Sequence, residues 1–331
     1  MNAKWLEKAV FSVADITAPA GGGLLSPEQA REFIRVAITE STLLRELNIF
    51  TSNSTKFEVP RISFASRVLK VGTEATRLTE PNRIKPTTGL VTLSTYLFKG
   101  EVPVSDEMFE DNIEKESLAD TLATMIAEAV GRDVEETVIK SDTDRDPGGA
   151  DVADVDSAEF DQFDGLIKLM QDDLPVGQKV DQSATTTYDE LFGKMIAALP
   201  ARYRRNYRQL RIYVPTKHRD GYIQEIGGRG TLLGDSALID GMESRLAYRG
   251  IPVVEVPLMS GTTTINGGAI DYSKFVFLTH PMNVYLGFHR RVRLERWRDP
   301  REGATSFLPS VRFDAKFGDP AFAVLGYDIA L

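Results

Sequence analysis

The sequence contains no cysteine among its 331 residues. This absence excludes disulfide bonds, thiolate metal sites and a cysteine nucleophile, and it is compatible with a reducing cytosol. The chain also lacks any apolar run that approaches the roughly 20 residues needed to cross a bilayer, so we expect no membrane partner. The remaining composition, with 42% hydrophobic and 26% charged residues, is that of an ordinary globular protein.

Positive charge is also scarce, because 39 Lys and Arg residues stand against 48 Asp and Glu residues and leave a formal net charge of -9. A whole-surface attraction to nucleic acid or to an anionic membrane is therefore not expected. Any contact with nucleic acid has to be local.

Candidate catalytic groups are few. The three histidines lie far apart, and none has a second histidine or a glutamate at helical metal-ligand spacing. The glycine-rich stretch 227–231 lacks the Gly-Lys-Ser/Thr ending of a phosphate loop, and no Gly-x-Ser-x-Gly elbow is present. Asp142, Asp144 and Asp146 are spaced as in a calcium loop, but Ala153 replaces the bidentate glutamate, so we predict a solvated loop. We predict no catalytic residue, no cofactor and no metal.

The most informative feature is a polar excursion flanked by two strand-like segments, 56–64 and 90–98. A two-stranded hairpin without a third strand or a covering helix is marginal in water, so this ribbon needs an external surface. The natural supplier is another copy of the same chain. We predict that apolar and charged residues of the excursion contact that copy: Phe57, Val59, Leu90, Val91 and Leu93 by packing, and Glu74, Arg77, Glu80, Arg83 and Lys85 by pairing with charged partners.

A long amphipathic helix is predicted after the ribbon. Its apolar residues keep one stripe from Leu118 to Ile139, and Ser117 with Asp120 forms a capping-box pattern at its start. At 1.5 Å per residue the helix would be about 33 Å long, which is enough to brace a whole domain.

The rest of the chain divides into an N-terminal arm and a mixed α/β unit. Residues 1–50 contain a short amphipathic segment, a triple glycine at position 21 and a second predicted helix. In the α/β unit, Thr187 and Glu190 form a capping box, and the helix that they open ends at Pro200. Short runs rich in branched residues predict strands at 210–214, 251–256 and 274–279.

Two arginine clusters are candidates for contacts between subunits. Arg202 and Arg205 belong to a run of five arginines, interleaved with tyrosines, that could also form a nucleic-acid stacking platform. Because the chain is acidic overall, we favour a connector or a loop that meets an acidic neighbour. Arg291 and Arg293 lie on an alternating strand pattern, where rows of arginine suit bidentate pairing with carboxylates of another subunit.

Four segments stand out by their order and spacing: Phe57-Glu58-Val59-Pro60, Val102-Pro103-Val104-Ser105-Asp106-Glu107-Met108-Phe109-Glu110-Asp111, Val130-Gly131-Arg132-Asp133-Val134-Glu135-Glu136 and Arg249-Gly250-Ile251-Pro252-Val253-Val254. Together they resemble the major capsid proteins of tailed bacteriophages. Each segment alone is a pattern of ordinary residues, but the resemblance covers nearly the whole chain in the right order.

The resemblance implies the Hong Kong 97-type capsid fold, which belongs to the α+β class. An N-terminal arm would comprise residues 1–50, and an extended β-hairpin loop residues 51–101. A discontinuous peripheral domain with the spine helix would comprise 102–159 and 271–331, and a mixed α/β axial domain 160–270. The extended loop would lie over a neighbouring subunit, in agreement with the ribbon that needs an external surface.

The resemblance also implies a function and partners. The chain would be a major capsid protein, not an enzyme, that assembles into hexamers and pentamers of an icosahedral shell around double-stranded phage DNA. Its partners would be copies of itself, a portal, an optional decoration protein and non-specific DNA on the inner face. Twenty residues precede Gly21, so we expect a separate scaffolding protein or none. The protein would be part of the virion after assembly in the host cytoplasm.

Three other functions stay open. An encapsulin-like nanocompartment shares the fold but would enclose a cargo enzyme in place of a genome. A soluble hydrolase or nucleotide-binding enzyme would need an assembled nucleophile or a phosphate loop. A nucleic-acid-binding module would need the arginine run at 202–211 to dominate, with binding that falls steeply in salt.

Overall fold

The structure is a computed structural model of the chain. It describes residues 43–52, 54–63, 85–111, 116–143, 162–205, 207–228, 246–265 and 268–331, together with Leu69, Val71, Glu74, Arg77 and Arg83. The expected helices of the N-terminal arm, Glu80 and most of the acidic stretch after Asp142 lie outside the described residues.

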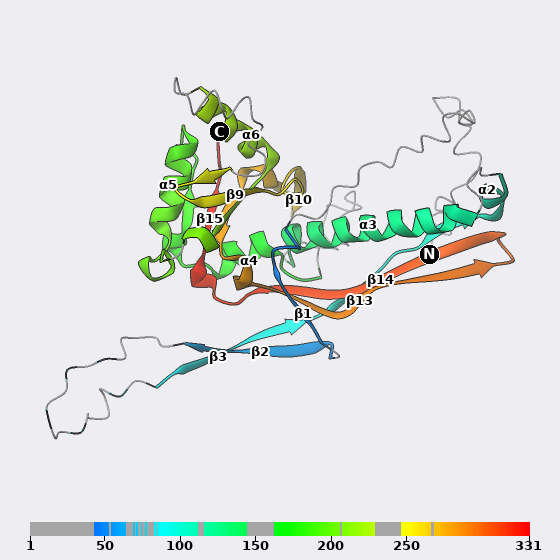
Figure 1. Ribbon diagram of the computed structural model, residues 1–331, viewed down its shortest axis with the longest axis horizontal. Coiled ribbons are helices and arrows are strands. Elements are labelled where there is room, and N and C mark those ends of the chain that lie inside the picture. Colours follow the sequence, from blue (N-terminus) through cyan, green and yellow to red (C-terminus); the bar gives the residue numbers. More distant parts are fainter. Residues whose placement is uncertain are drawn as a thin grey trace.

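A long mixed sheet forms one side of the molecule. Its centre is the antiparallel pair β13 and β14, which runs beside the spine helix (Figure 1). The N-terminal strand β1 pairs in parallel with β13, and β4 and β5 both pair antiparallel with β14. The bounds are β1 (Asn48–Thr51), β4 (Tyr96–Lys99), β5 (Val102–Ser105), β13 (Val284–Asp299) and β14 (Ala304–Phe317).

A second, six-stranded sheet has the order β6-β15-β12-β7-β9-β8. The strands are β6 (Lys179–Asp181), β7 (Arg211–Val214), β8 (Ala247–Tyr248), β9 (Ile251–Glu255), β12 (Val276–Thr279) and β15 (Ala323–Tyr327). Alternate residues face two different cores: Tyr213 and Phe277 belong to one, and Ile212 and Leu278 to the other. The three strands expected at 210–214, 251–256 and 274–279 are therefore confirmed, each slightly shorter than predicted.

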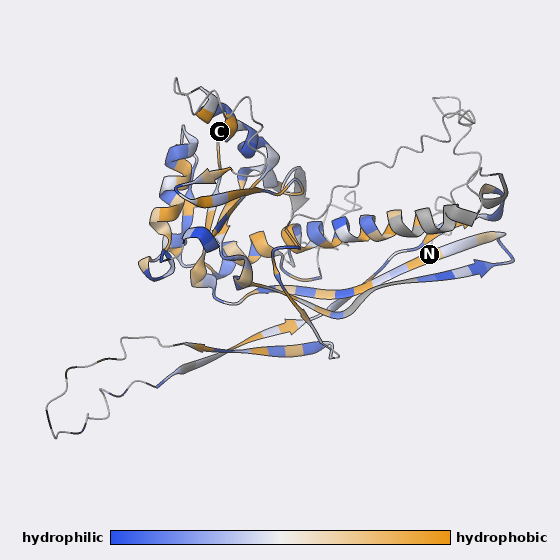
Figure 2. Ribbon diagram, viewed as in Figure 1, coloured by the Kyte–Doolittle hydropathy of each residue, from blue (hydrophilic) through white to orange (hydrophobic). Residues whose placement is uncertain are grey.

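Helices cover this second sheet. The helix predicted between Thr187 and Pro200 is α5 (Tyr188–Ala198), and its cap is confirmed because the Thr187 side chain accepts a hydrogen bond from the Glu190 amide at 3.3 Å. With α6 (Thr216–Gly227), it packs its apolar residues into the second core. Figure 2 shows the hydrophobic strands of the sheet beside these helices.

The expected boundary at residue 271 separates strands that the structure joins. Residues 271–331 were expected in the peripheral part, yet β12 pairs with β7 and β15 pairs with β6, and both partners belong to the axial part. The physical reason is that their alternate buried residues complete both cores of the six-stranded sheet. A small hairpin of β10 (Thr262–Ile265) and β11 (Gly268–Asp271) precedes β12.

The predicted spine helix is confirmed as α3 (Glu116–Lys140), which has 25 residues. It follows α2 (Asp106–Asp111) and leads toward α4 (Leu166–Asp173). The helix begins at Glu116, so Ser117 lies inside its first turn and is not the N-cap that the sequence predicted. Val134, Val138 and Ile139 pack the C-terminal half of α3 against the main core.

Candidate assembly interface

The ribbon predicted from the sequence is present. Among the described residues, strands β2 (Lys56–Ser63) and β3 (Thr87–Ser94) pair only with each other, in an antiparallel register from Lys56 with Ser94 to Ser63 with Thr87. The ribbon projects from the body beyond the long strand pair (Figure 1). The expected single strand 90–98 is wrong at Thr95: the chain leaves the ribbon there, and β4 joins β14 because Phe98 packs on Phe313.

The base of the ribbon is anchored on its own chain. The Phe57 ring lies directly against Gly287 of β13, where an added Cβ would stand 2.4 Å from the ring carbon Cζ. Leu93, the cross-strand partner of Phe57, is completely buried. The cover that we expected only from another copy is therefore partly intramolecular at this end.

A buried aspartate fixes the end of β3. The Ser94 amide donates a hydrogen bond to Oδ2 of Asp314 at 2.7 Å, and Oδ1 of Asp314 has no partner among the described residues. Burial raises the pKa of Asp314 to about 6, helped by Asp164, against the lowering effects of the Ser94 amide and Lys316. Neutral pH thus keeps a desolvated carboxylate ionised at the ribbon base.

We expect Asp314→Asn to reduce the dependence of stability on pH. Because the folded pKa lies above the ordinary value of 3.8, the stabilisation from this group is complete below that value and is lost as the pH rises through about 6. The parent should lose about 2 kcal/mol of unfolding free energy through this group between pH 4 and pH 8. Asn can still accept the Ser94 hydrogen bond but does not titrate.

Chemical denaturation at both pH values measures this difference. The matched control is Asp328→Asn, at an exposed position with φ of 54°, a left-handed conformation that asparagine tolerates. The control should keep the pH profile of the parent. An Asp314→Asn variant with an unchanged profile would contradict the assignment.

A second set of contacts, which we call the Arg61 clamp, holds the ribbon farther from its base. Arg61 of β2 donates from Nη1 to the Gly318 carbonyl at 2.8 Å, and its Nη2 lies 2.5 Å from Oδ2 of Asp319. Phe57, Val59 and Arg61 share one face of β2, so this face is turned toward the body.

The opposite face of the distal ribbon is apolar and uncovered. Ile62 is 71% exposed and Leu90 is 63% exposed, and the register places both on the face away from Arg61. Leu69 and Val71, further along the excursion, are also exposed. Exposed apolar groups gathered on one element mark interaction surfaces in soluble proteins.

The predicted contact residues of the excursion differ in how exposed they are. Phe57 and Val59 are half-buried on the face turned toward their own body, so their contact with another subunit stays a prediction. Four charged residues are exposed: Glu74, Arg77, Arg83 and Lys85. Of the two apolar residues that are most exposed on the ribbon strands, Leu90 was a predicted contact residue and Ile62 was not.

The arginines of the run at 202–211 differ in their surroundings: some bind backbone carbonyls and others are exposed. Arg204 donates to the Leu199 and Ala197 carbonyls at the end of α5, at 2.6 and 2.7 Å, and Arg211 bonds the Arg208 carbonyl. These two arginines are structural. Arg202 and Arg205 are exposed, and the Arg202 guanidinium lies 4.4 Å over the Tyr203 ring.

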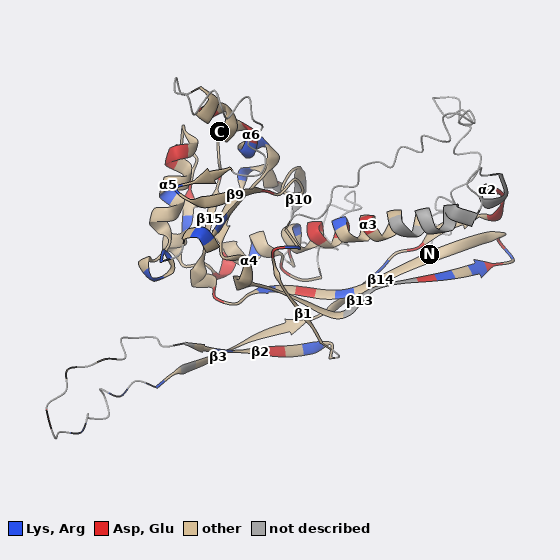
Figure 3. Cartoon of the chain, viewed as in Figure 1, with Lys and Arg blue, Asp and Glu red and all other residues tan. Residues whose placement is uncertain are grey.

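The second arginine cluster falls at an irregularity in β13. The backbone register shifts between Arg290 and Arg293, where the facing strand β14 advances by only two residues. The strict alternation that we expected through Arg291 and Arg293 is therefore interrupted, and their side chains lie outside the described part. Acidic and basic residues follow along the distal half of β13, where Arg298 pairs with Asp106 at 2.8 Å (Figure 3).

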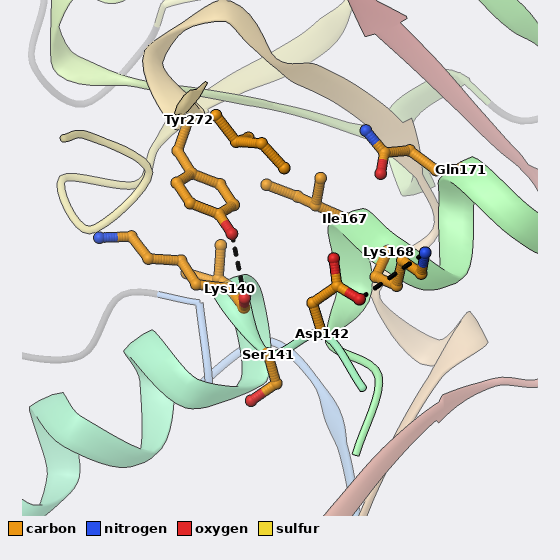
Figure 4. Close-up of a pocket in the computed structure, with 9 residues that line it drawn as sticks. Lys140, Ser141, Asp142, Ile167, Lys168, Gln171 and Tyr272 are labelled. Atoms are coloured by element: carbon orange, nitrogen blue, oxygen red, sulfur yellow. Dashed lines mark hydrogen bonds and ion pairs between the residues drawn. The ribbon is translucent and has the colours of Figure 1, made fainter. Parts of the chain in front are cut away.

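The described chain has a hollow of about 420 Å³ between α3 and strands β4 and β14, and a much smaller one. Figure 4 shows the smaller one, between the end of α3 and α4, where Tyr272 donates to the Lys140 carbonyl at 3.1 Å and Lys168 lies 3.6 Å from Asp142. Its volume of about 10 Å³ is that of one water molecule at most. Among the described residues, no three His, Asp or Glu side chains group as metal ligands, and no helix is long and apolar enough to cross a membrane.

The sequence and the fold match known capsid proteins. The model of the Phage capsid family matches residues 21–326. The chain is 27% identical over 316 residues to the prophage capsid protein YqbE of Bacillus subtilis (strain 168), which covers 96% of this chain and 95% of that protein.

Two solved structures show the fold at lower identity. The capsid of a native GTA particle matches with a TM-score of 0.63 and 19% identity over 95% of this chain and 99% of that chain. The holo-SrpI encapsulin complex from Synechococcus elongatus PCC 7942 matches with a TM-score of 0.57 and 12% identity over 96% and 95%. The α+β fold is thus of the Hong Kong 97 type.

The family match covers nearly all of the chain and agrees with the projecting ribbon, the spine helix and the six-stranded sheet. A capsid protein is a structural component of the virion and acts by association with copies of itself. The chain therefore belongs to the phage capsid family, as the protein that forms the shell.

Proposed function

We propose that the chain forms the hexamers and pentamers of an icosahedral shell around double-stranded phage DNA, and that the ribbon of each copy lies on a neighbouring copy. The observation that carries this proposal is the uncovered apolar face of the distal ribbon, with Ile62 and Leu90. Contact with a neighbour would bury this apolar surface. The burial would be favourable by about 25 cal/mol for each Å² removed from water.

Assembly needs only modest free energy from each contact. A specific interface of about 1,600 Å² in total is enough for a stable contact, and a closed shell multiplies such contacts through symmetry. The N-terminal arm, the extended loop, the peripheral part and the axial part remain the proposed division of the chain, with β12 and β15 moved to the axial part because of their pairing.

The other partners belong to the same proposal. A portal, a separate scaffolding protein and a decoration protein would join the shell, and DNA would meet its inner face without sequence preference. Assembly would take place in the host cytoplasm. No step of this account requires catalysis by the chain.

The ribbon can be tested by charging its apolar face. The double variant Ile62→Glu with Leu90→Glu should keep the stability of the isolated protomer within about 0.5 kcal/mol, because both side chains are exposed there. It should reduce the yield of particles at least about tenfold, because burying two unpaired carboxylates costs several kcal/mol. Electron microscopy and size-exclusion chromatography measure the yield.

The matched control is Val176→Glu, an exposed apolar residue that is remote from the ribbon in the sequence and lies beside the six-stranded sheet. This variant should assemble like the parent. Normal particles from the double variant would refute the proposed role of the ribbon.

An encapsulin-like compartment is the second candidate, because the encapsulin match shares the fold. The contents of the particles separate the two. DNA protected from added nuclease in particles from the native source supports the phage shell, whereas a co-purifying cargo enzyme without DNA supports the compartment.

A further inference from the structure

One carboxylate joins two surfaces that are far apart in the sequence. Oδ2 of Asp319 receives the Arg61 guanidinium of the ribbon at 2.5 Å and a hydrogen bond from the Tyr203 hydroxyl, also at 2.5 Å. Tyr203 belongs to the basic loop, which we define as residues 201–205 and 207–209. Both surfaces contain residues that are predicted from the sequence to contact other subunits.

Asp319 itself is held firmly. Its amide donates to Oδ1 of Asn283 at 2.8 Å, and Nδ2 of Asn283 donates back to the Asp319 carbonyl at 2.9 Å. Its Oδ1 accepts the Ala321 amide at 3.1 Å and so caps the short helix that follows. Oδ2 is therefore presented at a fixed place to its two donors.

The basic loop is coupled to this oxygen through one ring. The Tyr203 ring stacks on Phe322 with centroids 4.4 Å apart, and the Arg202 guanidinium also lies over this ring. Burial, together with the hydrogen bond to Asp319, raises the pKa of the Tyr203 hydroxyl to about 12. The hydroxyl thus keeps its proton at neutral pH and remains a hydrogen-bond donor to Asp319.

The ribbon depends on this clamp for its direction. Its base is fixed by Phe57 and Leu93, and farther out Arg61 holds it to the body through a hydrogen bond to Gly318 and an ion pair with Asp319. A two-stranded ribbon bends readily. The strength of the Arg61 clamp therefore determines how widely the direction of the ribbon varies, and with it the direction of the face that holds Ile62 and Leu90.

We propose that Asp319 is a positioning residue that couples the basic loop to the direction of the ribbon. Binding of an acidic surface of a second copy to Arg202 and Arg205 would displace the Tyr203 hydroxyl relative to Oδ2 of Asp319. This displacement would change the ion pair that Arg61 forms with the same oxygen. Such coupling is reciprocal, because two donors on one acceptor form a single network. The inference rests on the proposed shell function and adds a regulation of ribbon direction by the axial part.

The absence of cysteine makes a distance measurement straightforward. Spin labels on Leu90→Cys of the ribbon and Ala197→Cys of α5 are unique, and both positions are exposed. Pulsed electron paramagnetic resonance on unassembled, full-length protomers should give one narrow distance distribution in the labelled parent. Asp319→Asn should raise the population of displaced ribbon positions about tenfold, as expected for the loss of one charge-assisted hydrogen bond.

The decisive variant is Tyr203→Phe, because Tyr203 does not belong to the ribbon. It keeps the ring stack on Phe322, and it should broaden the same distance distribution. The matched control is Tyr207→Phe on the same loop, an exposed tyrosine, which should leave the distribution unchanged. Thermal melting confirms that each variant is folded.

The outcomes separate this inference from the proposed function. A distribution that Asp319→Asn broadens but Tyr203→Phe does not would overturn the coupling, and so would a distribution that neither variant changes. Particle formation by the unlabelled parent is judged independently in the electron microscope. A parent that never assembles would refute the shell proposal without affecting the distance result.

Discussion

Replacing Phe313 with alanine is expected to lower the free energy of unfolding by about 4 kcal/mol, the cost of removing a fully buried phenylalanine. The Phe313 ring lies at the meeting point of three segments. Its centroid is 4.8 Å from that of Phe98 in β4, 5.6 Å from that of Phe163 before α4, and 6.2 Å from that of Phe288 in β13. The cavity left by the ring would therefore weaken packing in the long sheet, at the turn from β3 to β4 and at the start of α4.

Equilibrium denaturation with urea measures this loss. The matched control is Trp297→Ala, which removes a larger aromatic ring from the same strand pair at a position that is 64% exposed. The control should change stability by less than about 0.5 kcal/mol. Equal losses in the two variants would show that Phe313 does not occupy the core as described.

Gly165→Ala is expected to destabilise the fold by about 3 kcal/mol, because the added methyl group has no room. Gly165 precedes α4 and donates to the Ser141 carbonyl at 2.7 Å. A Cβ there would lie 2.8 Å from the Ser141 amide nitrogen and 2.9 Å from the carbonyl oxygens of Val138 and Ile139. These are backbone atoms at the end of the spine helix, so no side chain can turn aside.

The spine helix also supplies the control for this substitution. Gly131 lies inside α3, and a Cβ at Gly131 meets no atom within 4 Å. Gly131→Ala should therefore stabilise the protein by about 0.5 to 1 kcal/mol through helix propensity and the unfolded-state entropy. The account predicts opposite signs for the two Gly→Ala changes. A stabilising Gly165→Ala would show that α4 does not approach α3 this closely.

The elements that could be predicted from the sequence are those with a local cause. The spine helix follows from an apolar stripe with the period of a helix, and the start of α5 follows from Thr187 with Glu190 three residues later. The strands of the six-stranded sheet follow from short runs of branched residues. Each of these signals lies within the element that it predicts.

The contacts that hold the ribbon have no such local signal. Asp314 lies on the same face of β14 as Arg312 and Lys316, and such a face is typically exposed to solvent. It is buried because β3 ends there, 220 residues away in the sequence. Asp319 likewise meets Arg61 and Tyr203 only through the tertiary fold. Sequence reasoning could not find these residues, and for the same reason it assigned Phe57 to an external partner.

The break between β3 and β4 shows the same limit. Residues 90–98 are uniformly strand-like, yet Thr95 turns the chain from the ribbon into the long sheet. The turn is stabilised by the hydrogen bond from the Ser94 amide to Asp314 and by the stacking of Phe98 on Phe313. Asp314 and Phe313 are both distant from the turn in the sequence. Propensity gives the type of structure here, and long-range packing decides which sheet each residue enters.

Electron microscopy of the purified full-length protein tests the central claim most directly. The chain should form closed, hollow particles of uniform size, in which the ribbon of each copy contacts a neighbour through Ile62 and Leu90. A protein that remains a single protomer at every concentration and salt condition tested, with these two side chains packed against its own body, would contradict the account.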